Sequence, residues 1–402
     1  MTPVELSRTV LRAVRRAVED GELSVVVPEK VLVTVPGAGG WGDYATNIAL
    51  QLARPAGETP RRVAELLRPH LVGAHGVSGV EITGPGFLNI SLGSTASIAL
   101  VEEILRRGPR YGFVDATDIS HRDDDRDLAG GQPAPTAPTT TPLLHLHAPN
   151  DPRALVVMDV VARLLRSQGT RVRTSSASRP ESEWPTFLGI DVGAEAGIEV
   201  GVDVGVDVGV EADAYRTPAP ETPTPPDAVD IRPVPASHPA DLLPLGRDAA
   251  RWALLYPAAH DRPRLTADHL VQRESNSLFR VRYAYARTRA VSRNAADLGF
   301  VARPGDVRDV RDVEEATTPL ATLLADHPRV LARAAAHRAP DLLARHLVAV
   351  ADATLALLPA VLPLGDEKPS AAHRARLALA EAAGAVLAGG LSLLGIDAPE
   401  HL

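Results

Sequence analysis

The sequence contains no cysteine, which excludes disulfide bonds, thiol nucleophiles and cysteine-ligated zinc. Lysine is almost absent: Lys30 and Lys368 are the two that occur in 402 residues, so arginine carries nearly all of the positive charge. Aromatic residues are few, at 3% of the chain, whereas proline is abundant. The N-terminus lacks an apolar signal segment, and we find no apolar run long enough to cross a bilayer. We therefore expect a cytoplasmic protein that does not contact a membrane.

An overall positive charge is also lacking, since the formal net charge is −8, which argues against a general nucleic-acid-binding protein. The acidic excess lies in the middle of the chain, where residues 114–250 carry 22 acidic and 11 basic side chains. The two ends are close to neutral. Binding to a structured RNA requires a local cationic strip and not a global excess, so this class of function stays open.

A cationic strip of this kind lies in residues 274–293, ESNSLFRVRYAYARTRAVSR. The segment has no Pro or Gly, and Ser275 or Asn276 can cap its start, so we expect a helix. Residues at helical spacing share one face: Arg282, Tyr285, Arg289 and Arg293, with Arg280 and Arg287 beside them. A second face looks suited to burial: Phe279, Tyr283, Ala286 and Ala290.

Arginine side chains interleaved with tyrosine are suited to RNA. A guanidinium binds phosphate with two parallel hydrogen bonds, and an aromatic ring stacks on an unpaired base. The same pattern also fits the solvated, charged face of a bundle helix. The spacing alone leaves both interpretations open.

Residues 276–287, NSLFRVRYAYAR, resemble the helix that opens the anticodon-binding domain of arginyl-tRNA synthetases, which is named for its Asp-Ala-Leu-Arg signature. The departures are Ser277, Arg282 and Tyr285, where the family has Pro, Gln and His. Residues 389–400 resemble the C-terminal signature of the same family. The resemblance implies an all-α anticodon-binding helical bundle over residues 245–402, with helices at about 319–324, 328–337, 340–358 and 371–391. It implies tRNA contacts from these residues: Arg280, Arg282, Tyr283, Tyr285, Arg287, Arg289 and Arg293.

Residues 1–113 are expected to form an α/β domain. Alternating and β-branched segments predict its strands, and amphipathic segments predict its helices, the last of which closes the unit. We expect helices at about 2–20, 60–71 and 94–107, a further helix starting near Asp43, and strands at 25–27, 31–35, 77–83 and 87–92.

Two motifs in this region, at residues 42–47 and 81–90, resemble the N-terminal additional domain of arginyl-tRNA synthetases. The resemblance implies contact with the elbow of tRNA, with Tyr44 and Asn47 as candidate contacts. For Asp43, Asn47 and Asn89, capping and turn chemistry is the favoured explanation over RNA contact.

The middle of the chain is interpreted as linkers around a reduced α/β remnant. Residues 114–142 read as a flexible linker with an acidic cluster at 123–127, and 217–239 as a second Pro-rich linker. Residues 143–174 predict a strand, a helix and a strand. A Gly-Val-Asp repeat at 197–210 predicts a variable insertion, or a strand, and we expect no metal site in either acidic segment.

By resemblance, residues 143–244 take the place of the Rossmann-like catalytic domain, but both catalytic signatures are missing. The His-x-Gly-His turn is replaced by residues 148–153, APNDPR, without glycine. His145 and His147 lie two apart on a strand, so we interpret them as remnants, with at most residual ATP binding, or as packing residues. No lysine is present where the family has its Lys-Met-Ser-Lys loop, which stabilises the pyrophosphate. We assign no catalytic residue.

The sequence thus predicts a multidomain, arginyl-tRNA synthetase-like protein that binds tRNA, in particular arginine tRNA, and lacks aminoacylation activity and any cofactor. One alternative is an arginine–tRNA ligase with an unusual active site, which would use ATP and magnesium. Another is a non-catalytic partner of a true synthetase. An assay of arginine-dependent ATP–pyrophosphate exchange separates the non-catalytic prediction from the ligase alternative.

Overall fold

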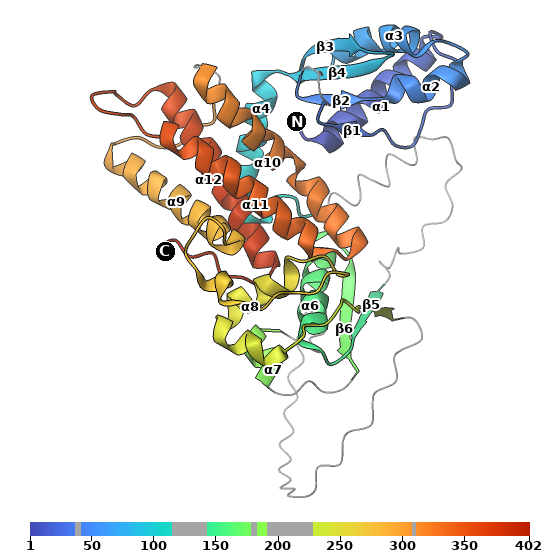
Figure 1. Ribbon diagram of the computed structural model, residues 1–402. Helices are drawn as coiled ribbons and strands as arrows, with labels where there is room; N and C mark the ends of the chain where they lie inside the picture. The colour runs from blue at the N-terminus through green and yellow to red at the C-terminus, as the bar shows by residue number, and fades with distance from the viewer. Residues whose placement is uncertain (37–41, 115–142, 178–182, 191–227, 308–310) are drawn as a thin grey trace, which may run out of the picture.

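The computed structural model describes residues 1–36, 42–114, 143–177, 183–190, 228–307 and 311–402 (Figure 1). The acidic cluster at 123–127 and the repeat at 197–210 lie outside the described residues, as do the first linker and half of the second. In the rest of the chain the side chains form two hydrophobic cores, one in the N-terminal domain and a larger one extending from residue 100 to residue 396.

The N-terminal domain is an antiparallel sheet, in the strand order β1-β2-β4-β3, packed against helices (Figure 1). Helix α1 starts at a capping box in which Thr2 and Glu5 satisfy each other's backbone amides. The predicted strand at 25–27 does not form, and the next is shorter than expected. The elements are α1 (Pro3–Glu19), β1 (Val33–Thr34), β2 (Tyr44–Thr46), α2 (Ile48–Ala56), α3 (Pro60–Val72), β3 (Val77–Thr83) and β4 (Phe87–Leu92).

Helix α4 (Ser94–Arg107) has the predicted bounds but not the predicted place. It does not close the α/β unit. It contacts α12 (Ala371–Leu393) instead, and its buried Leu100, Val101 and Ile104 belong to the larger core. The turn after α4, η1 (Gly108–Arg110), also lies against α12, and this approach depends on Gly389, because a Cβ atom there would collide with the carbonyl of Pro109.

The remnant of an α/β unit consists of β5 (Leu143–Ala148), β6 (Arg171–Ser176) and β7 (Val229–Asp230), all parallel, in the order β6-β5-β7. Helix α6 (Pro152–Ser167) connects β5 to β6 and is buried along most of its length. A short α7 (Glu183–Leu188) contacts α8 (Gly246–Leu255). This sheet confirms the predicted strand–helix–strand unit.

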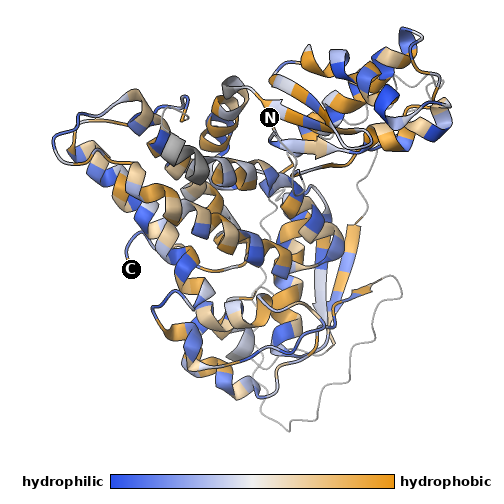
Figure 2. Cartoon of the chain, turned by 45° about the horizontal axis from the view of Figure 1, so that its top comes forward, coloured by the Kyte–Doolittle hydropathy of each residue, from blue (hydrophilic) through white to orange (hydrophobic). Residues whose placement is uncertain are grey.

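The C-terminal part is a bundle of α8 (Gly246–Leu255), α9 (Ser277–Asp297), α10 (Arg311–His337), α11 (Pro340–Leu357) and α12. Its helices carry hydrophobic and hydrophilic residues side by side (Figure 2). Helix α10 joins two predicted helices, and Pro319 and Pro328 lie inside it. It continues past them because Leu320, Leu324 and Leu331 are fully buried, so packing outweighs the hydrogen bonds that proline removes.

Two of these helices are apolar and long enough to span a membrane by length and composition, at Pro340–Ala360 and Ala371–Leu393, so our expectation of no such run was wrong. Their apolar windows are 50% and 78% buried within the protein, and α12 contacts α4, α9 and α11. Their hydrophobicity is explained by packing inside the bundle. The bundle and the remnant sheet share the larger core, so the boundary that we place at residue 245 divides elements that pack together.

Two histidines are buried where α10, α11 and the end of the α4 segment meet. The rings of Tyr111, His327 and His346 stack with centroid separations of 6.0 and 5.3 Å. Burial, together with the neighbouring His346, lowers the pKa of His327. Burial also lowers the pKa of His346 to about 4, against the opposing effect of Asp326. Both rings are therefore neutral in the folded protein at pH 7.

This stack predicts an acid-sensitive fold. A histidine with a lowered pKa binds fewer protons in the folded than in the unfolded state, so its contribution is complete above pH 6.5 and is lost as pH falls towards about 4. For His346 the loss amounts to about 3 kcal/mol. His346→Leu should therefore flatten the dependence of the free energy of unfolding on pH in urea titrations from pH 7 to 4. His337→Leu, at an exposed position of α10, should leave the slope unchanged, and equal slopes in both variants would contradict the prediction.

Candidate functional site

The expected cationic helix is formed as α9, and its start is fixed by Asn276. The side-chain oxygen of Asn276 accepts from the amides of Leu278 and Phe279, and its amide group donates to the carbonyls of His269 and Val271. Asn276 is 7% exposed. This conspicuous residue of the motif is therefore a helix cap.

The faces of α9 differ from the expected ones. Of the four residues expected on a buried face, Ala286 is buried, Phe279 and Ala290 are half-buried, and Tyr283 is exposed. The ring of Tyr283 stacks on Phe279 at 5.4 Å, and the guanidinium of Arg287 lies 5.9 Å from its centroid. The helix is rotated in this way because α11 and α12 pack on it from two sides, and they cover a different set of residues. The buried set is Leu278, Val281, Ala284, Ala286, Thr288, Val291 and Ala295.

We name Phe279, Tyr283 and Arg287 the aromatic ladder. They follow each other at intervals of four residues, so they lie one above the other on one side of α9. Among the described residues Arg287 has no carboxylate within 4 Å, and its side chain is exposed. The ring of Tyr283 lies between Phe279 and the Arg287 guanidinium, so a base stacks on it once the guanidinium swings aside, and the displaced cation is then available for phosphate.

The arginine stripe, in contrast, is largely neutralised within the protein. Arg282 pairs with Asp248 and donates to the carbonyl of Asp397 at 3.0 Å. Glu400 lies 3.2 Å from Arg289 and 3.9 Å from Arg293. Two of these partners, Asp397 and Glu400, belong to the segment that follows α12.

The remaining candidates on α9 are also engaged. Arg280 forms two hydrogen bonds with Asp352 of α11, at 2.9 and 3.0 Å. Tyr285 is half-buried against the larger core, so it does not stand on the surface beside the arginines. Local sequence patterns could not predict these partners, because they lie at least 34 positions away from the arginines in the chain.

In the N-terminal domain the two candidate contacts have different environments. Tyr44 is 3% exposed, and burial raises the pKa of its hydroxyl, which argues against direct contact between its ring and RNA. Asn47 is half-buried at the start of α2 and accepts from Gln51 at 2.9 Å, so part of its polar surface stays accessible. Asp43 accepts from the amide of Leu92, and Asn89 donates to Thr83, which fits the turn chemistry considered above.

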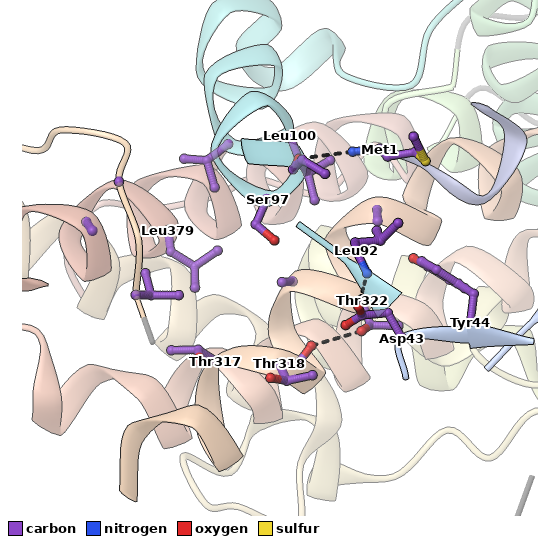
Figure 3. A pocket seen from close by; sticks show the side chains of 17 residues that line it. Met1, Asp43, Tyr44, Leu92, Ser97, Leu100, Thr317, Thr318, Thr322 and Leu379 are labelled. Carbon is purple, nitrogen blue, oxygen red and sulfur yellow. Dashed lines mark hydrogen bonds between the residues drawn. The ribbon is translucent and has the colours of Figure 1, made fainter. Parts of the chain in front are cut away.

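Tyr44 and Asp43 border a narrow hollow between the N-terminal domain, α4 and α10 (Figure 3). Thr318, Thr322 and Leu100 contribute to its wall. Its volume of about 50 Å³ accommodates a water molecule or two, but not a nucleotide. We interpret it as a packing gap between the two cores.

The candidate nucleotide site lies at the carboxyl ends of the parallel strands. His145 and His147 both hydrogen-bond the hydroxyl of Ser175 on β6, each at 2.9 Å. His147 is 3% exposed, and burial, Arg173 and His147 together lower the pKa of His145. The pair is thus engaged within the sheet, as expected for packing residues, and does not point to the turn before α6.

That turn does not fit a triphosphate. The carboxylate of Asp151 accepts from the amide of Ala154 at 3.0 Å and so occupies the start of α6. A helix start is a favourable place for phosphate because its amides are free and its dipole is positive there. The fixed carboxylate of Asp151 takes up one of these amides and places a negative charge at the helix start, which repels a phosphate. ATP would be the cofactor of a ligase, and these residues do not accommodate it.

Two buried arginines that sequence analysis missed organise this region. Arg153, in the first turn of α6, is fully buried and donates to the carbonyls of residues 234, 254, 257, 258 and 261 at 2.5–3.1 Å. Arg251 of α8 is also fully buried and pairs with Asp159 at 2.6 Å. Arg153 precedes an apolar stretch of α6, and that position was the available signal, whereas α8 also carries Arg247 and Asp248, so Arg251 gave no such signal. No group of three or more potential metal ligands occurs within the described part of the chain.

Comparison with known families and proteins gives a consistent result. Residues 281–402 match the model of the DALR anticodon binding domain, and residues 5–92 match the arginyl tRNA synthetase N-terminal domain. The chain is 42% identical over 175 residues to a protein of Renibacterium salmoninarum named arginine–tRNA ligase, a match that covers 43% of this chain and 30% of the ligase.

Other relatives align over the whole chain. The arginine–tRNA ligase of Pseudarthrobacter chlorophenolicus is 29% identical over 559 aligned positions, which cover 100% of both proteins, although this chain has 402 residues. The fold is similar to that of arginyl-tRNA synthetase from Thermus thermophilus, with a TM-score of 0.61, 14% identity and full coverage of both chains. The enzyme from Plasmodium falciparum gives 0.62, 10% identity and coverage of 100% and 99%.

Proposed function

The chain belongs to the arginyl-tRNA synthetase family, and on this premise we propose that it binds tRNA, in particular arginine tRNA, without aminoacylating it. The observation that supports binding is the aromatic ladder on α9, in which Tyr283 and Arg287 are exposed and Phe279 is half-buried. We propose the division made above on the basis of the sequence, with boundaries near residues 113 and 245; in the folded chain α4 and the remnant sheet share the larger core with the bundle. We expect the protein to act in translation, in the cytoplasm.

In this proposal a base of the anticodon loop stacks on Tyr283, and Arg287 neutralises the neighbouring phosphate. Base stacking on an aromatic side chain contributes about 1–3 kcal/mol. Arg282, Arg289 and Arg293 lie beside the ladder, and RNA phosphates must displace Glu400 from Arg289 and Arg293 before they can bind there. Asn47 is a second, more distant contact.

The ladder can be tested by filter binding with an arginine tRNA transcript. The double variant Tyr283→Ala/Arg287→Glu should bind about 100-fold more weakly, because one stacking surface and one phosphate contact are lost. Glu400→Gln should bind several-fold more tightly, since it frees Arg289 and Arg293. Arg333→Glu, an equal charge change at an exposed position of α10, serves as the control. Equal affinity of the double variant and the control would refute the proposed surface.

Lack of catalysis is a separate part of the proposal. Asp151 occupies the helix start that a triphosphate needs, and no lysine occurs between Lys30 and Lys368 to stabilise pyrophosphate. Removal of a single stabilising group of this kind typically costs about 100- to 1000-fold in rate. Arginine-dependent ATP–pyrophosphate exchange by the purified protein should therefore not exceed the value without protein.

The second candidate function is that of an arginine–tRNA ligase. The whole-chain alignment with proteins of that name favours it. Substantial exchange activity would establish this alternative and the ATP and magnesium requirement that it carries. Such a result would refute the proposed lack of catalysis but would not affect the proposal that the protein binds tRNA.

A further inference from the structure

A second basic surface lies beside α8, on a loop whose backbone carbonyls accept hydrogen bonds from the buried Arg153. Arg153 donates to the carbonyls of Pro257, Ala258 and Asp261, so its guanidinium fixes the course of residues 257–261. Burial lowers the pKa of Arg153, whereas the carboxylates of Asp151, Asp261 and Asp341 act in the opposite direction. The partners of the guanidinium are all carbonyl groups, so its charge is not cancelled by direct ion pairing.

The fixed loop leads into an open hollow of about 480 Å³. Arg262, Arg264 and Arg345 line it together with Tyr256 and His269. All three arginines are exposed. Among the described residues Arg262 and Arg264 have no carboxylate within 4 Å, and Arg345 lies 3.6 Å from Asp341. Asp261 is the one acidic residue in the lining.

The charge and shape of this hollow favour an anion. Three guanidinium groups around a concave surface present paired donors suited to phosphate oxygens, and the buried charge of Arg153 adds to the positive potential. Tyr256 is half-buried and stacked on Trp252 at 5.4 Å, so one wall of the hollow is rigid. The sequence analysis did not single out Arg262, Arg264 or Arg345.

The hollow also adjoins α9. His269, whose ring contacts the carbonyl of Arg264 at 2.9 Å, lines both this hollow and a neighbouring one that includes Phe279 and Arg282. The basic surface is thus continuous with the start of the helix that bears the ladder. A polyanion bound on α9 can therefore extend into the hollow, whereas a small free anion would occupy one of the two surfaces and not connect them.

We propose that Arg262, Arg264 and Arg345 bind phosphates of the RNA backbone, as a second contact of the same RNA that binds to α9. This inference rests on the proposed function, because it assumes that the protein binds tRNA. These phosphate contacts do not recognise bases. They therefore increase the affinity for RNA of any sequence and contribute to the salt dependence of binding.

The test is the affinity of the full chain for an arginine tRNA transcript over a series of salt concentrations. Arg262→Glu/Arg264→Glu should weaken binding at least tenfold near physiological salt and lower the slope of log affinity against log salt by about 2. Arg61→Glu/Arg62→Glu, an equal charge change on α3, should leave both quantities unchanged. Circular dichroism and thermal unfolding should be the same for both variants, because all four side chains are exposed.

Each outcome is decisive. If the unaltered protein binds no tRNA, the proposed function fails and this inference fails with it. If the unaltered protein binds tRNA and Arg262→Glu/Arg264→Glu keeps its affinity and salt slope, this inference alone is overturned. Calorimetric titration with inorganic phosphate and with ATP forms a second arm. Stoichiometric binding of either probe that the variant loses, with tRNA binding unchanged, would assign the hollow to a free phosphate compound and overturn the RNA assignment.

Discussion

Replacing Arg153 by methionine is expected to lower the free energy of unfolding by about 3–5 kcal/mol, because five carbonyls lose a charged donor in the interior. Methionine fills much of the volume but donates no hydrogen bond. The loop at 257–261 should loosen, since three of those carbonyls belong to it. Urea unfolding followed by circular dichroism measures the change.

Arg166→Met provides the matched control for this experiment. Arg166 lies on the same helix, is half-buried and donates a single hydrogen bond, to the carbonyl of Val172 at 3.0 Å. Its replacement should cost about 1 kcal/mol. If the two variants lose similar stability, the hydrogen bonds from Arg153 to five carbonyls are not the source of the stabilisation that we describe. Because Arg153 also supports the hollow, its variant should weaken tRNA binding even at low temperature, where the fold is retained.

Replacing Arg251 by methionine is expected to cost a similar amount, about 3–4 kcal/mol, for a different reason. Arg251 joins three elements: it pairs with Asp159 of α6 at 2.6 Å and donates to the carbonyls of Leu188 and Leu394, at 2.8 and 2.9 Å. Its loss leaves Asp159 buried with Arg163 as the remaining partner, at 3.0 Å. A buried carboxylate that loses its main counter-ion is strongly destabilising.

A double variant separates the effect of the unpaired carboxylate charge from the effect of the lost hydrogen bonds. Arg251→Met/Asp159→Leu removes both charges, so it should regain part of the stability that Arg251→Met loses, in the same urea titration. The two carbonyls stay unsatisfied in both variants, which is why recovery should be incomplete. A double variant that is less stable than Arg251→Met would show that the ion pair is not the source of the loss.

The sequence predicted several elements well because their signals are local. Strands β3 and β4 and helix α4 have the predicted bounds, and Asn276 caps α9 as expected. Such features follow from alternation, helical spacing and capping, which act over a few residues. The single helix α10 was missed, since the cost of its two prolines is outweighed by the burial of leucines that contact other elements.

The candidate site was predicted in composition but not in geometry. The sequence identified α9 as the helix with arginines and tyrosines, yet its buried and exposed faces depend on α11 and α12, which approach it from two sides. Tyr283 therefore stands on the surface while Tyr285 is half-buried. The carboxylates that pair with the stripe, Asp248, Asp352 and Glu400, lie far away in sequence, so no local pattern could reveal that this charge is largely neutralised.

The sequence by itself determined which chemistry is present: arginine and not lysine as the cation, no thiol, and no glycine at the turn after β5. It also determined most helices and strands, because their signals lie within each segment. The tertiary structure alone decided that Arg287 beside Tyr283, and the pair Arg262 and Arg264, belong to the cations that have no carboxylate within 4 Å in the described part of the chain. The reason is physical: whether a charge is available depends on every group within a few ångströms, and folding brings those groups from all parts of the chain.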